Sequence, residues 1–356
     1  MISGHLRAAV ERARFTIAQR ARCDVDLLNA ATVVEELHPA GTVVGPPCIS
    51  LARQYERVRG CAFGIDIAAE IAVMKGEAPR RLQPTVRYEL RDVFVTRGAL
   101  YSRGRRKLFN GELQGNPRAS AWKEYDEIGL RSSFIGCYFF GDWLCHDCAT
   151  HLLAERGGTP MSMPTPAWPD RAAYVALFGQ AYTELDEAHV NRLVLFDDIT
   201  HNAHKAERFR TLRAGLARTR LPAAAGRIVY MKRGVGGQPR KLLNEAEITE
   251  SLVRRGVVVV EAEALSGDQI VTELLGARMV VGIEGSQLSH ALYTLRDGGG
   301  ILAIQPPDRL FNAHMDWARV LNMRYGVVVG EERPPGFHLP VDDLLRTIDL
   351  MDAQLA

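Results

Sequence analysis

The alternation of hydrophobic and polar positions is most regular in the second half of the chain. Short apolar runs rich in Val and Ile are separated there by segments whose apolar residues recur three or four positions apart. Such runs are typical of buried strands, and the wider spacing is typical of amphipathic helices. The pattern predicts strands at 227–233, 257–263, 278–283, 299–305 and 324–330, with helices at 244–256, 266–277, 286–295 and 313–322. Strands that alternate with helices favour βαβ units and a parallel sheet.

The first half has a less regular pattern. Residues 86–108 alternate between apolar and polar positions and contain Gly98 and Gly104 at the expected turns, which predicts a small antiparallel meander. Residues 132–155 predict a short apolar strand, a break at Gly141 and then a helix. A strand at 192–198 and a basic helix at 203–217 follow. This half is therefore predicted to be mixed α/β, separated from the second by a linker at 219–226.

Length and composition indicate an ordinary globular protein of two domains. The chain has 356 residues, of which 47% are hydrophobic and 24% are charged. The formal net charge is only +2, so we expect no nucleic-acid partner. The arginine-dense stretch 97–109 is interpreted as a solvated basic hairpin, with an acidic-ligand contact as the alternative. No apolar run reaches the ~18–20 residues that span a bilayer.

Residues 1–23 contain no continuous apolar core of a signal peptide, so we expect a cytoplasmic protein. This stretch predicts an amphipathic helix that packs on its own domain. The alternative is peripheral contact with an anionic surface at the inner membrane face.

The six cysteines are expected to be free thiols rather than a disulfide framework. Cys145, Cys148 and His151 would lie on neighbouring turns of one helix, without a second Cys-x-x-Cys pair to complete a tetrahedral site. Packing cysteines are therefore favoured over zinc or a redox pair, and no metal is predicted.

Two loops at the carboxyl ends of predicted parallel strands carry the candidate chemistry. Lys232, Arg233 and Arg240 bracket a glycine-rich turn after the first strand, and Asn244 is expected to cap the next helix. The stretch "VVGIEGSQLSHALY" (280–293) turns from strand to helix around Glu284. Arginines and a helix N-terminus both suit phosphate, so a phosphorylated or nucleotide ligand is expected at this edge. A capped helix with solvent-facing arginines is the structural alternative.

The sequence of these loops resembles glycosyltransferase family 61 (the DUF563 type). The segments "YMKRG", "RKLLNEAEI", "VVGIEGSQLSHALY" and "GGILAIQPP" match the C-terminal half of that family, at Arg233, Arg240, Asn244, Glu245, Gly282, Gly285 and Pro306. The stretch "YFFGDWLCHD" (138–147) is similar to a motif in its N-terminal half. The resemblance covers residues 86–325, and the first eighty residues have no recognised counterpart.

The resemblance implies a GT-B-like fold, in which two Rossmann-like domains face each other across a cleft. The implied domains are an N-terminal helical or extension region (1–85), an acceptor-side α/β domain (86–222), a nucleotide-sugar-binding domain (223–335) and a C-terminal helix (336–356) that could pack back on the N-terminal domain. The implied activity is inverting, metal-independent transfer of a sugar from a nucleotide-sugar donor, without a cofactor. The implied donor-binding residues are Lys232, Arg233, Arg240, Asn244, Glu245, Gly282, Glu284, Gly285, Ser286, Gln287 and His290.

Glu284 stands where that family usually has His. We interpret the backbone amides of Gly285 and Ser286 as phosphate ligands and Glu284 as an acceptor of hydrogen bonds from ribose or sugar hydroxyls. His290, one turn further on, could supply the missing positive charge or could be a core residue. An inverting transfer needs a base for the acceptor hydroxyl. The candidates are Asp142, Asp147 and His146, each of which could instead cap or solvate its helix.

The expected partners are a nucleotide-sugar donor and a glycan, lipid-linked or small-molecule acceptor, in bacterial surface polysaccharide or capsule biosynthesis. Two other classes stay open. A non-catalytic nucleotide- or glycan-binding relative is favoured by the substituted His. A Rossmann-type oxidoreductase is disfavoured, because Arg240 lies where the pyrophosphate-binding helix should begin.

Overall fold

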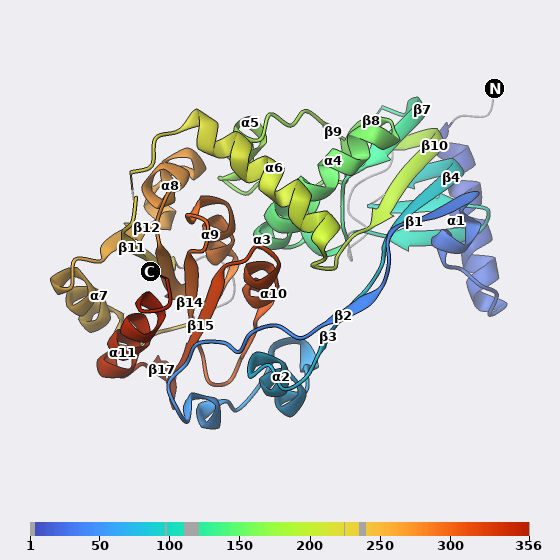
Figure 1. The fold of residues 1–356 in the computed structure, drawn as a ribbon. Coiled ribbons are helices and arrows are strands. Elements are labelled where there is room, and N and C mark those ends of the chain that lie inside the picture. Colours follow the sequence, from blue (N-terminus) through green and yellow to red (C-terminus); the bar gives the residue numbers. More distant parts are fainter. Residues whose placement is uncertain (1–3, 97, 110–120, 224, 235–239, 356) are drawn as a thin grey trace. The chain divides into compact units, whose positions relative to one another are not determined.

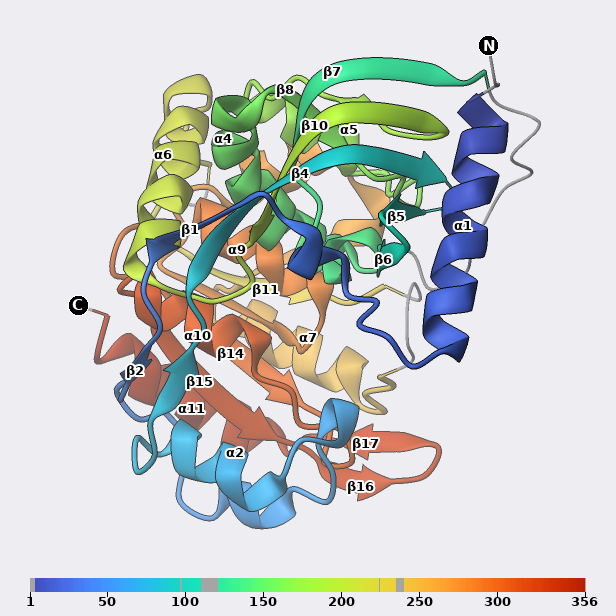
Figure 2. The same cartoon turned by 90° about the vertical axis from the view of Figure 1, so that its right-hand side faces the viewer.

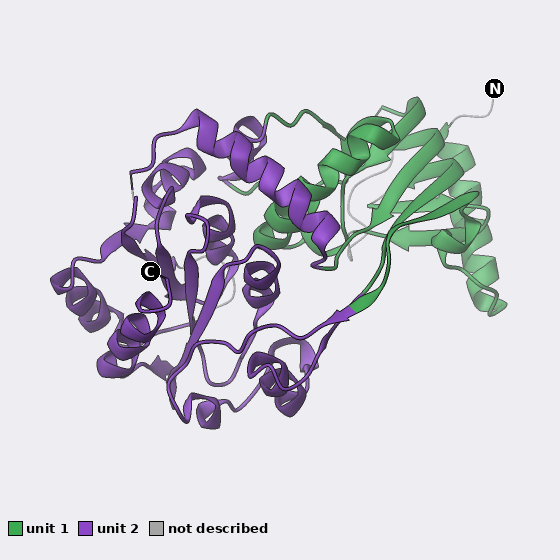
Figure 3. Ribbon diagram, in the orientation of Figure 1, with its two compact units in different colours: residues 1–41, 83–168, 179–200 green, residues 42–82, 169–178, 201–356 purple. Residues whose placement is uncertain are grey.

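The computed structural model describes residues 4–96, 98–109, 121–223, 225–234 and 240–355 (Figure 1). The chain forms two compact units. Unit 1 comprises residues 1–41, 83–168 and 179–200, and unit 2 comprises residues 42–82, 169–178 and 201–356 (Figure 3). Each unit thus combines segments that are distant in sequence. In particular, residues 42–82, which the sequence suggests as part of an N-terminal extension, pack in unit 2 with the regular second half of the chain.

Unit 1 is built on a mixed eight-stranded sheet of order β6-β5-β4-β10-β7-β8-β9, with β1 paired to β4. The strands are β1 (Val33–His38), β4 (Thr85–Thr96), β5 (Ala99–Ser102), β6 (Arg105–Leu108), β7 (Lys123–Leu130), β8 (Thr159–Ser162), β9 (Thr183–Glu184) and β10 (Ala188–Asp197). Strands β4, β5 and β6 form the predicted antiparallel meander. Strands β10, β7, β8 and β9 run parallel, so the sheet is mixed rather than wholly parallel.

Helix α1 (Gly4–Arg20) packs on its own unit, as the sequence predicts. It contacts β4, β5 and β6 (Figure 2), and it buries Ala8, Glu11 and Phe15. The Phe15 ring meets Tyr101 edge to face, with centroids 6.0 Å apart. The Glu11 carboxylate accepts a hydrogen bond from the Gly104 amide at 3.0 Å, which ties the helix to the β5–β6 turn. The apolar stripe of α1 is therefore used within the protein.

The prediction of a strand within residues 132–139 is wrong, whereas the helix after Gly141 is confirmed. The chain forms a 3₁₀ turn (Ile135–Cys137), α3 (Phe140–Asp142), a π-helical turn (Trp143–Asp147) and α4 (Cys148–Gly157). The Asp147 carboxylate accepts hydrogen bonds from the Ser133 amide and hydroxyl, at 2.9 and 2.7 Å. These bonds hold the apolar run against the helix instead of letting it pair as a strand, and sequence periodicity does not reveal them.

Unit 2 contains the predicted parallel sheet. Its five strands have the order β12-β11-β13-β14-β15. They are β11 (Ile228–Lys232), β12 (Val258–Glu261), β13 (Met279–Ile283), β14 (Gly300–Gln305) and β15 (Arg324–Val329), and every neighbouring pair is parallel. The helices between them are α7 (Glu245–Arg254), α8 (Gly267–Leu274), α9 (Ser289–Thr294) and α10 (Ala313–Val320). All predicted elements of this half are confirmed.

Helices cover both faces of the parallel sheet (Figure 1). Helices α7 and α11 (Val341–Asp352) contact each other on one face, where Leu252, Leu344 and Ile348 join the buried core with Val281 and Leu302. Helices α9 and α10 lie on the other face, and α5 (Arg171–Leu177) and α6 (Ala203–Thr219) pack outside them. The suggestion that the C-terminal helix packs back on the N-terminal domain is corrected, because α11 packs on β15 and α7 of its own unit.

Residues 42–82 add to the edge of this sheet. The Ile49 amide donates to the Tyr325 carbonyl and the Val327 amide donates to the Ile49 carbonyl, both at 2.9 Å. Arg80 binds Glu70, on α2 (Ile67–Met74), through two hydrogen bonds of 2.7 and 3.0 Å, and its Nε lies 3.1 Å from Asp316 of α10. The segment is thereby fixed along β15.

The remaining strands are short pairs, β2 (Gly41–Val43) with β3 (Arg80–Leu82) and β16 (Glu331–Arg333) with β17 (Gly336–His338). Within the described ranges, no helix is both long enough and apolar enough to cross a membrane.

Candidate functional site

The strand order of unit 2 marks one point on its sheet as the place for a ligand. From β11 the chain passes to β12 on one side and later to β13 and β14 on the other, so the order reverses between β11 and β13. Ligands of open α/β sheets bind beyond the carboxyl ends of the strands at such a reversal. Arg233 follows the end of β11, and Glu284 follows the end of β13. The two loops singled out from the sequence therefore meet at this point.

Three arginines converge on the turn after β13. Arg240 Nη2 lies 3.0 Å from Glu284 Oε2, and Arg240 Nη1 donates to the Glu284 carbonyl at 2.7 Å. Arg309 Nη1 lies 3.4 Å from the same carboxylate oxygen. Arg233 Nη1 donates to Gln287 Oε1 at 2.9 Å. We call Arg233, Arg240, Arg309 and Glu284 the arginine cluster.

The arginine cluster keeps an excess of positive charge. Burial lowers the pKa of Arg240 to about 10 and also lowers the pKa of Arg233, while the Glu284 carboxylate opposes both shifts. A pKa of about 10 leaves the Arg240 guanidinium protonated near neutral pH. Glu263 also favours the charged form of Arg233. Even with Glu263 counted, positive groups outnumber negative ones, which suits an anionic ligand.

Gly285 allows the arginines to approach the backbone this closely. The backbone φ of Gly285 is 154°, a conformation that residues other than glycine rarely adopt. A β-carbon at this position would collide with the guanidinium groups of Arg233 and Arg240. Gly282 is similarly restricted, because a β-carbon there would lie 2.9 Å from the Met231 carbonyl. Gly282 thus serves close packing between β11 and β13, and Gly285 makes room for the arginine side chains. Ser286 begins the helical turn that follows, and the role of its amide stays a prediction.

The structure gives Glu284 different partners from the hydroxyls we expected. Its side chain is only 2% exposed, and its carboxylate binds Arg240 and Arg309. Glu284 therefore compensates part of the arginine charge. Acceptance of hydrogen bonds from ribose or sugar hydroxyls stays a prediction.

Several other predicted donor contacts hold the loops together. Lys232 Nζ pairs with Glu261 at 3.0 Å, and the Tyr230 hydroxyl donates to Glu245 at 2.9 Å. Asn244 precedes α7 as expected but does not cap it with its side chain. Its amide group instead exchanges two hydrogen bonds with the backbone of Leu339, at 2.9 and 3.1 Å. The cap prediction is wrong because the backbone of Leu339, 95 positions later, binds the Asn244 side chain instead. No pattern in the sequence around Asn244 indicates this contact.

His290 does not supply a positive charge. It is buried in α9, its Nδ1 lies 2.6 Å from the Tyr174 hydroxyl, and its Nε2 lies 3.7 Å from Asp170. Burial lowers the pKa of His290 to about 3, so the ring is neutral near pH 7. Of the two interpretations of His290, the core residue is the one that agrees with the structure.

The three candidate bases lie in unit 1 and differ in exposure. Asp147 is fully buried and holds Ser133, which makes it a structural carboxylate. His146 is buried, with its Nε2 3.7 Å from Asp142 Oδ1. The Asp142 side chain is 33% exposed. Asp142 is therefore the candidate of the three that an acceptor hydroxyl can reach most easily.

Sequence reasoning missed Arg309 and Phe63. Arg309 follows Pro306 and Pro307 at the carboxyl end of β14, a position that could have been examined for the same reason as Arg233. Its guanidinium also lies 5.7 Å from the centroid of the Phe63 ring. No pattern near Phe63 indicates this contact, because it depends on how residues 42–82 fold onto the sheet. The glycine-rich part of the first loop, residues 235–239, lies outside the described residues.

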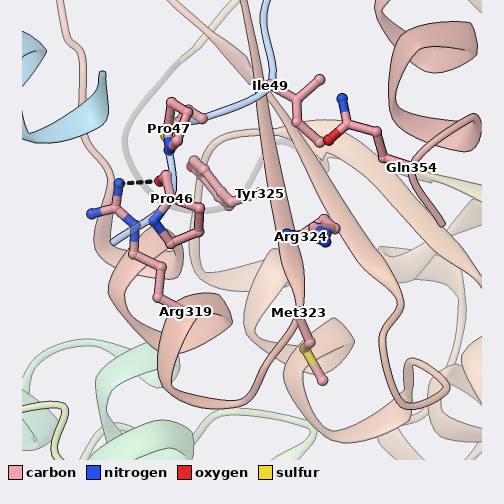
Figure 4. A pocket seen from close by; sticks show the side chains of 9 residues that line it. Pro46, Pro47, Ile49, Arg319, Met323, Arg324, Tyr325 and Gln354 are labelled. Carbon is pink, nitrogen blue, oxygen red and sulfur yellow. Dashed lines mark hydrogen bonds between the residues drawn. The ribbon is translucent and has the colours of Figure 1, made fainter. Parts of the chain in front are cut away.

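A separate cavity of about 210 Å³ opens near the start of β15. Figure 4 shows Pro46, Ile49, Arg319 and Tyr325 around it, with Arg319 donating to the Pro46 carbonyl at 2.8 Å. The cavity lies at the amino end of β15 and therefore at the opposite edge of the sheet from the arginine cluster. Burial raises the pKa of the Cys48 thiol in its wall to about 12, so this thiol is not a ready nucleophile.

The cysteines are free thiols, in agreement with the expectation. Cys145 and Cys148 are buried in the helix that follows Gly141. Burial raises the pKa of Cys148 to about 12. Their packing role is consistent with this environment.

A doubly wound parallel sheet with an arginine cluster at its reversal point defines an α/β protein whose positively charged groups lie at the usual ligand-binding edge of such a sheet. The sequence pattern described as Glycosyltransferase 61 matches residues 69–302, well over half of the chain. The chain belongs to this family. No curated protein gives a significant match. Membership implies a sugar donor and an acceptor in general terms, and the matched range includes Arg233, Arg240, Glu284 and Asp142 but neither Phe63 nor Arg309.

Replacing Glu284 with Gln tests what the buried carboxylate does. Glu284→Gln keeps the shape but removes the charge that competes with a bound anion for Arg240 and Arg309. We expect inorganic pyrophosphate and nucleoside diphosphates to bind roughly 3- to 10-fold more tightly. Folding stability should fall, because Arg240 loses a buried partner. Isothermal titration calorimetry and thermal melts measure the two effects.

Glu247→Gln, which changes an exposed carboxylate at the start of α7, is the matched control. Weaker binding of an intact nucleotide-sugar to Glu284→Gln, with pyrophosphate binding unchanged, would contradict the charge-compensating role and favour the hydroxyl contact.

Proposed function

We propose that this protein transfers a sugar from a nucleotide-sugar donor to an acceptor hydroxyl, with inversion at the anomeric carbon and without a metal ion. The observation that carries the proposal is the convergence of Arg233, Arg240 and Arg309 at the reversal point of the parallel sheet. Membership of the glycosyltransferase 61 family supports it. Of the earlier alternatives, the family assignment favours sugar transfer over dinucleotide oxidation.

The arginine cluster would bind the diphosphate of the donor. When the bond between the anomeric carbon and the diphosphate oxygen breaks, negative charge grows on the leaving diphosphate. Guanidinium groups held in place before the reaction stabilise that charge without reorganising. This is the part that a divalent cation would play in a metal-dependent transferase, and it accounts for the proposed metal independence.

Asp142 is our proposed general base. Its carboxylate would accept the proton of the acceptor hydroxyl as that oxygen attacks the anomeric carbon from the face opposite the diphosphate. Direct displacement of this kind inverts the configuration. The proposal requires a GT-B-like arrangement, in which the unit that carries Asp142 and the unit that carries the arginine cluster share one cleft.

The acceptor is proposed to be a glycan, a lipid-linked sugar or a small molecule, within the assembly of a bacterial surface polysaccharide such as a capsule. The second candidate function is a non-catalytic nucleotide-sugar binder. It is favoured by one observation, the buried Glu284 at a position where we expected His from the resemblance. Turnover of any nucleotide-sugar decides between the two candidates.

A melting experiment with UDP, GDP, CDP and ADP in excess EDTA tests the proposed function. A ligand that binds only the folded state raises the melting temperature by mass action, so at least one diphosphate should raise it while the metal is chelated. The preferred base then selects nucleotide-sugars for a transfer assay. EDTA should leave the transfer rate unchanged. Activity that disappears with EDTA and returns with Mg²⁺ or Mn²⁺ would overturn the metal-free mechanism, and no response to any diphosphate would overturn nucleotide binding.

A further inference from the structure

Residues 57–63 pass across the carboxyl ends of β14 and β15. Arg57 Nη1 donates to the Val329 carbonyl at 3.0 Å, and the Arg59 amide donates to the Pro307 carbonyl at 2.6 Å. The Leu310 amide donates to the Gly60 carbonyl at 2.8 Å, and the Ala62 amide donates to the Leu310 carbonyl at 3.0 Å. These bonds fix the segment to the same edge of the sheet that carries the arginine cluster.

Phe63 lies at the end of this segment in an unusual state. Its side chain is 68% exposed, although burial of a phenylalanine is worth about 1.5–3 kcal/mol. Its φ is 57°, which residues other than glycine seldom adopt and which costs of the order of 1–3 kcal/mol. The Phe63 ring is held edge to face on Phe311, with centroids 5.3 Å apart and planes at 70°. The fold thus holds an aromatic ring in place at the surface, in a strained backbone.

Arg309 is the member of the arginine cluster that contacts this ring. Its guanidinium carbon lies 5.7 Å from the centroid of Phe63, and its Nη1 lies 3.4 Å from the Glu284 carboxylate. A ligand whose phosphates bind the arginine cluster therefore has an exposed aromatic ring beside it, one arginine away.

We propose that Phe63 is the stacking platform for the nucleobase of the donor, a role that rests on the proposed function. A nucleobase is flat and aromatic, and it is tied through ribose to the diphosphate that the arginine cluster would hold. Every base has a π-face that stacks on an aromatic side chain. The guanidinium of Arg309 lies near both the Phe63 ring and the Glu284 carboxylate. It can therefore contact either the base or the phosphate of a bound nucleotide with little movement. Phe63 and Arg309 lie outside the matched range of the family, so membership alone does not assign a role to either residue.

Comparing inorganic pyrophosphate with a nucleoside diphosphate separates the platform from the arginine cluster. Pyrophosphate reports the cluster alone, and the nucleoside diphosphate adds the base and ribose. For Phe63→Ala we expect the affinity for the preferred nucleoside diphosphate to fall roughly 5- to 150-fold, the range that base stacking gives on alanine substitution. The affinity for pyrophosphate should stay unchanged. Phe63→Tyr, which keeps the ring, should keep nucleoside diphosphate affinity.

Leu350→Ala, a substitution of a partly exposed apolar residue on α11, is the control and should change neither affinity. Melting curves of all variants verify that they are folded. Equal loss of pyrophosphate and nucleoside diphosphate binding in folded Phe63→Ala would mean that the ring only positions Arg309, and the platform would be overturned. Unchanged nucleoside diphosphate affinity with weaker binding of the intact nucleotide-sugar would move the contact to the sugar and also overturn it.

The outcomes also separate this proposal from the proposed function. Suppose that the unmodified protein binds pyrophosphate and the nucleoside diphosphate, and that Phe63→Ala binds each of them as tightly as the unmodified protein does. The platform then fails while the proposed function stands. If the unmodified protein binds neither compound, the proposed function fails and the platform fails with it.

Discussion

Asp142→Asn should lower the turnover of the transfer reaction by about 10²- to 10⁴-fold, the range typical of a lost general base. The substitution keeps the shape of the side chain and removes its ability to accept the proton of the acceptor hydroxyl. Because Asp142 is 33% exposed, the melting temperature should hardly change. Donor affinity, measured with the nucleoside diphosphate, should also be preserved. A full kinetic analysis of the transfer reaction measures the effect on turnover.

Asp147→Asn is the matched control for this prediction. Asp147 is buried and accepts two hydrogen bonds from Ser133, so its substitution should destabilise the fold by about 1–3 kcal/mol. The two variants should therefore separate chemistry from stability. Asp142→Asn with normal turnover would remove Asp142 from the mechanism, and the base would have to be sought at His146 or outside this motif.

Arg240→Ala should weaken binding of a nucleoside diphosphate by roughly 10- to 150-fold, which corresponds to the about 1.5–3 kcal/mol of a hydrogen bond to a charged group. Turnover should fall as well, because charge on the departing diphosphate increases in the transition state. The same substitution leaves Glu284, only 2% exposed, without its nearest cation. Breaking a buried ion pair in this way costs about 3–5 kcal/mol of folding stability. Calorimetry and thermal melts give the two quantities separately.

Two further variants complete this experiment. Arg254→Ala removes an exposed cation on α7 and should leave diphosphate binding nearly unchanged. The double variant Arg240→Gln with Glu284→Gln has no unpaired buried carboxylate at this site, so it should recover stability without recovering affinity. Unchanged affinity of Arg240→Ala for UDP, GDP, CDP and ADP alike would show that the first loop does not bind phosphate.

The secondary structure of the regular half of the chain could be predicted because neighbouring residues in the sequence determine it. Each strand from β11 to β15 is a short apolar run, and each helix between them has its own amphipathic period, so strand and helix follow from neighbouring residues. The parallel direction follows from the alternation. The meander of β4, β5 and β6 was predictable for the same reason, through the turns that contain Gly98 and Gly104.

The errors occur where distant residues decide the outcome. The run before Gly141 has the apolarity of a strand, but the buried carboxylate of Asp147 binds Ser133 and holds the run as an irregular segment with one 3₁₀ turn. Asn244 has the position of a helix cap, but the Leu339 backbone offers it two hydrogen bonds. The sequence around these residues indicates neither the contact of Asp147 with Ser133 nor that of Asn244 with Leu339.

The candidate site divides in the same way. Arg233 and Glu284 were found because each follows a predicted strand directly. Arg309 and Phe63 were missed, since their proximity to Glu284 depends on strand order and on the path of residues 42–82. The charge on Glu284 was visible in the sequence, but its partners were not. An isolated Glu in a phosphate-binding turn becomes understandable only when the arginines around it are known.

The path of residues 42–82 has a consequence for how the protein is made. Gln54 accepts a hydrogen bond from the amide of Val329, 275 positions later in the chain. Ribosomes add about 5–20 residues per second, so this early segment waits on the order of tens of seconds for its partner strand. During that time Ile49 and its neighbours have no sheet to join and are available to chaperones and proteases. The folding of unit 2 is therefore expected to be completed only after synthesis ends. Residues 42–82, the part of unit 2 that is synthesised first, would be among the last to pack onto its sheet.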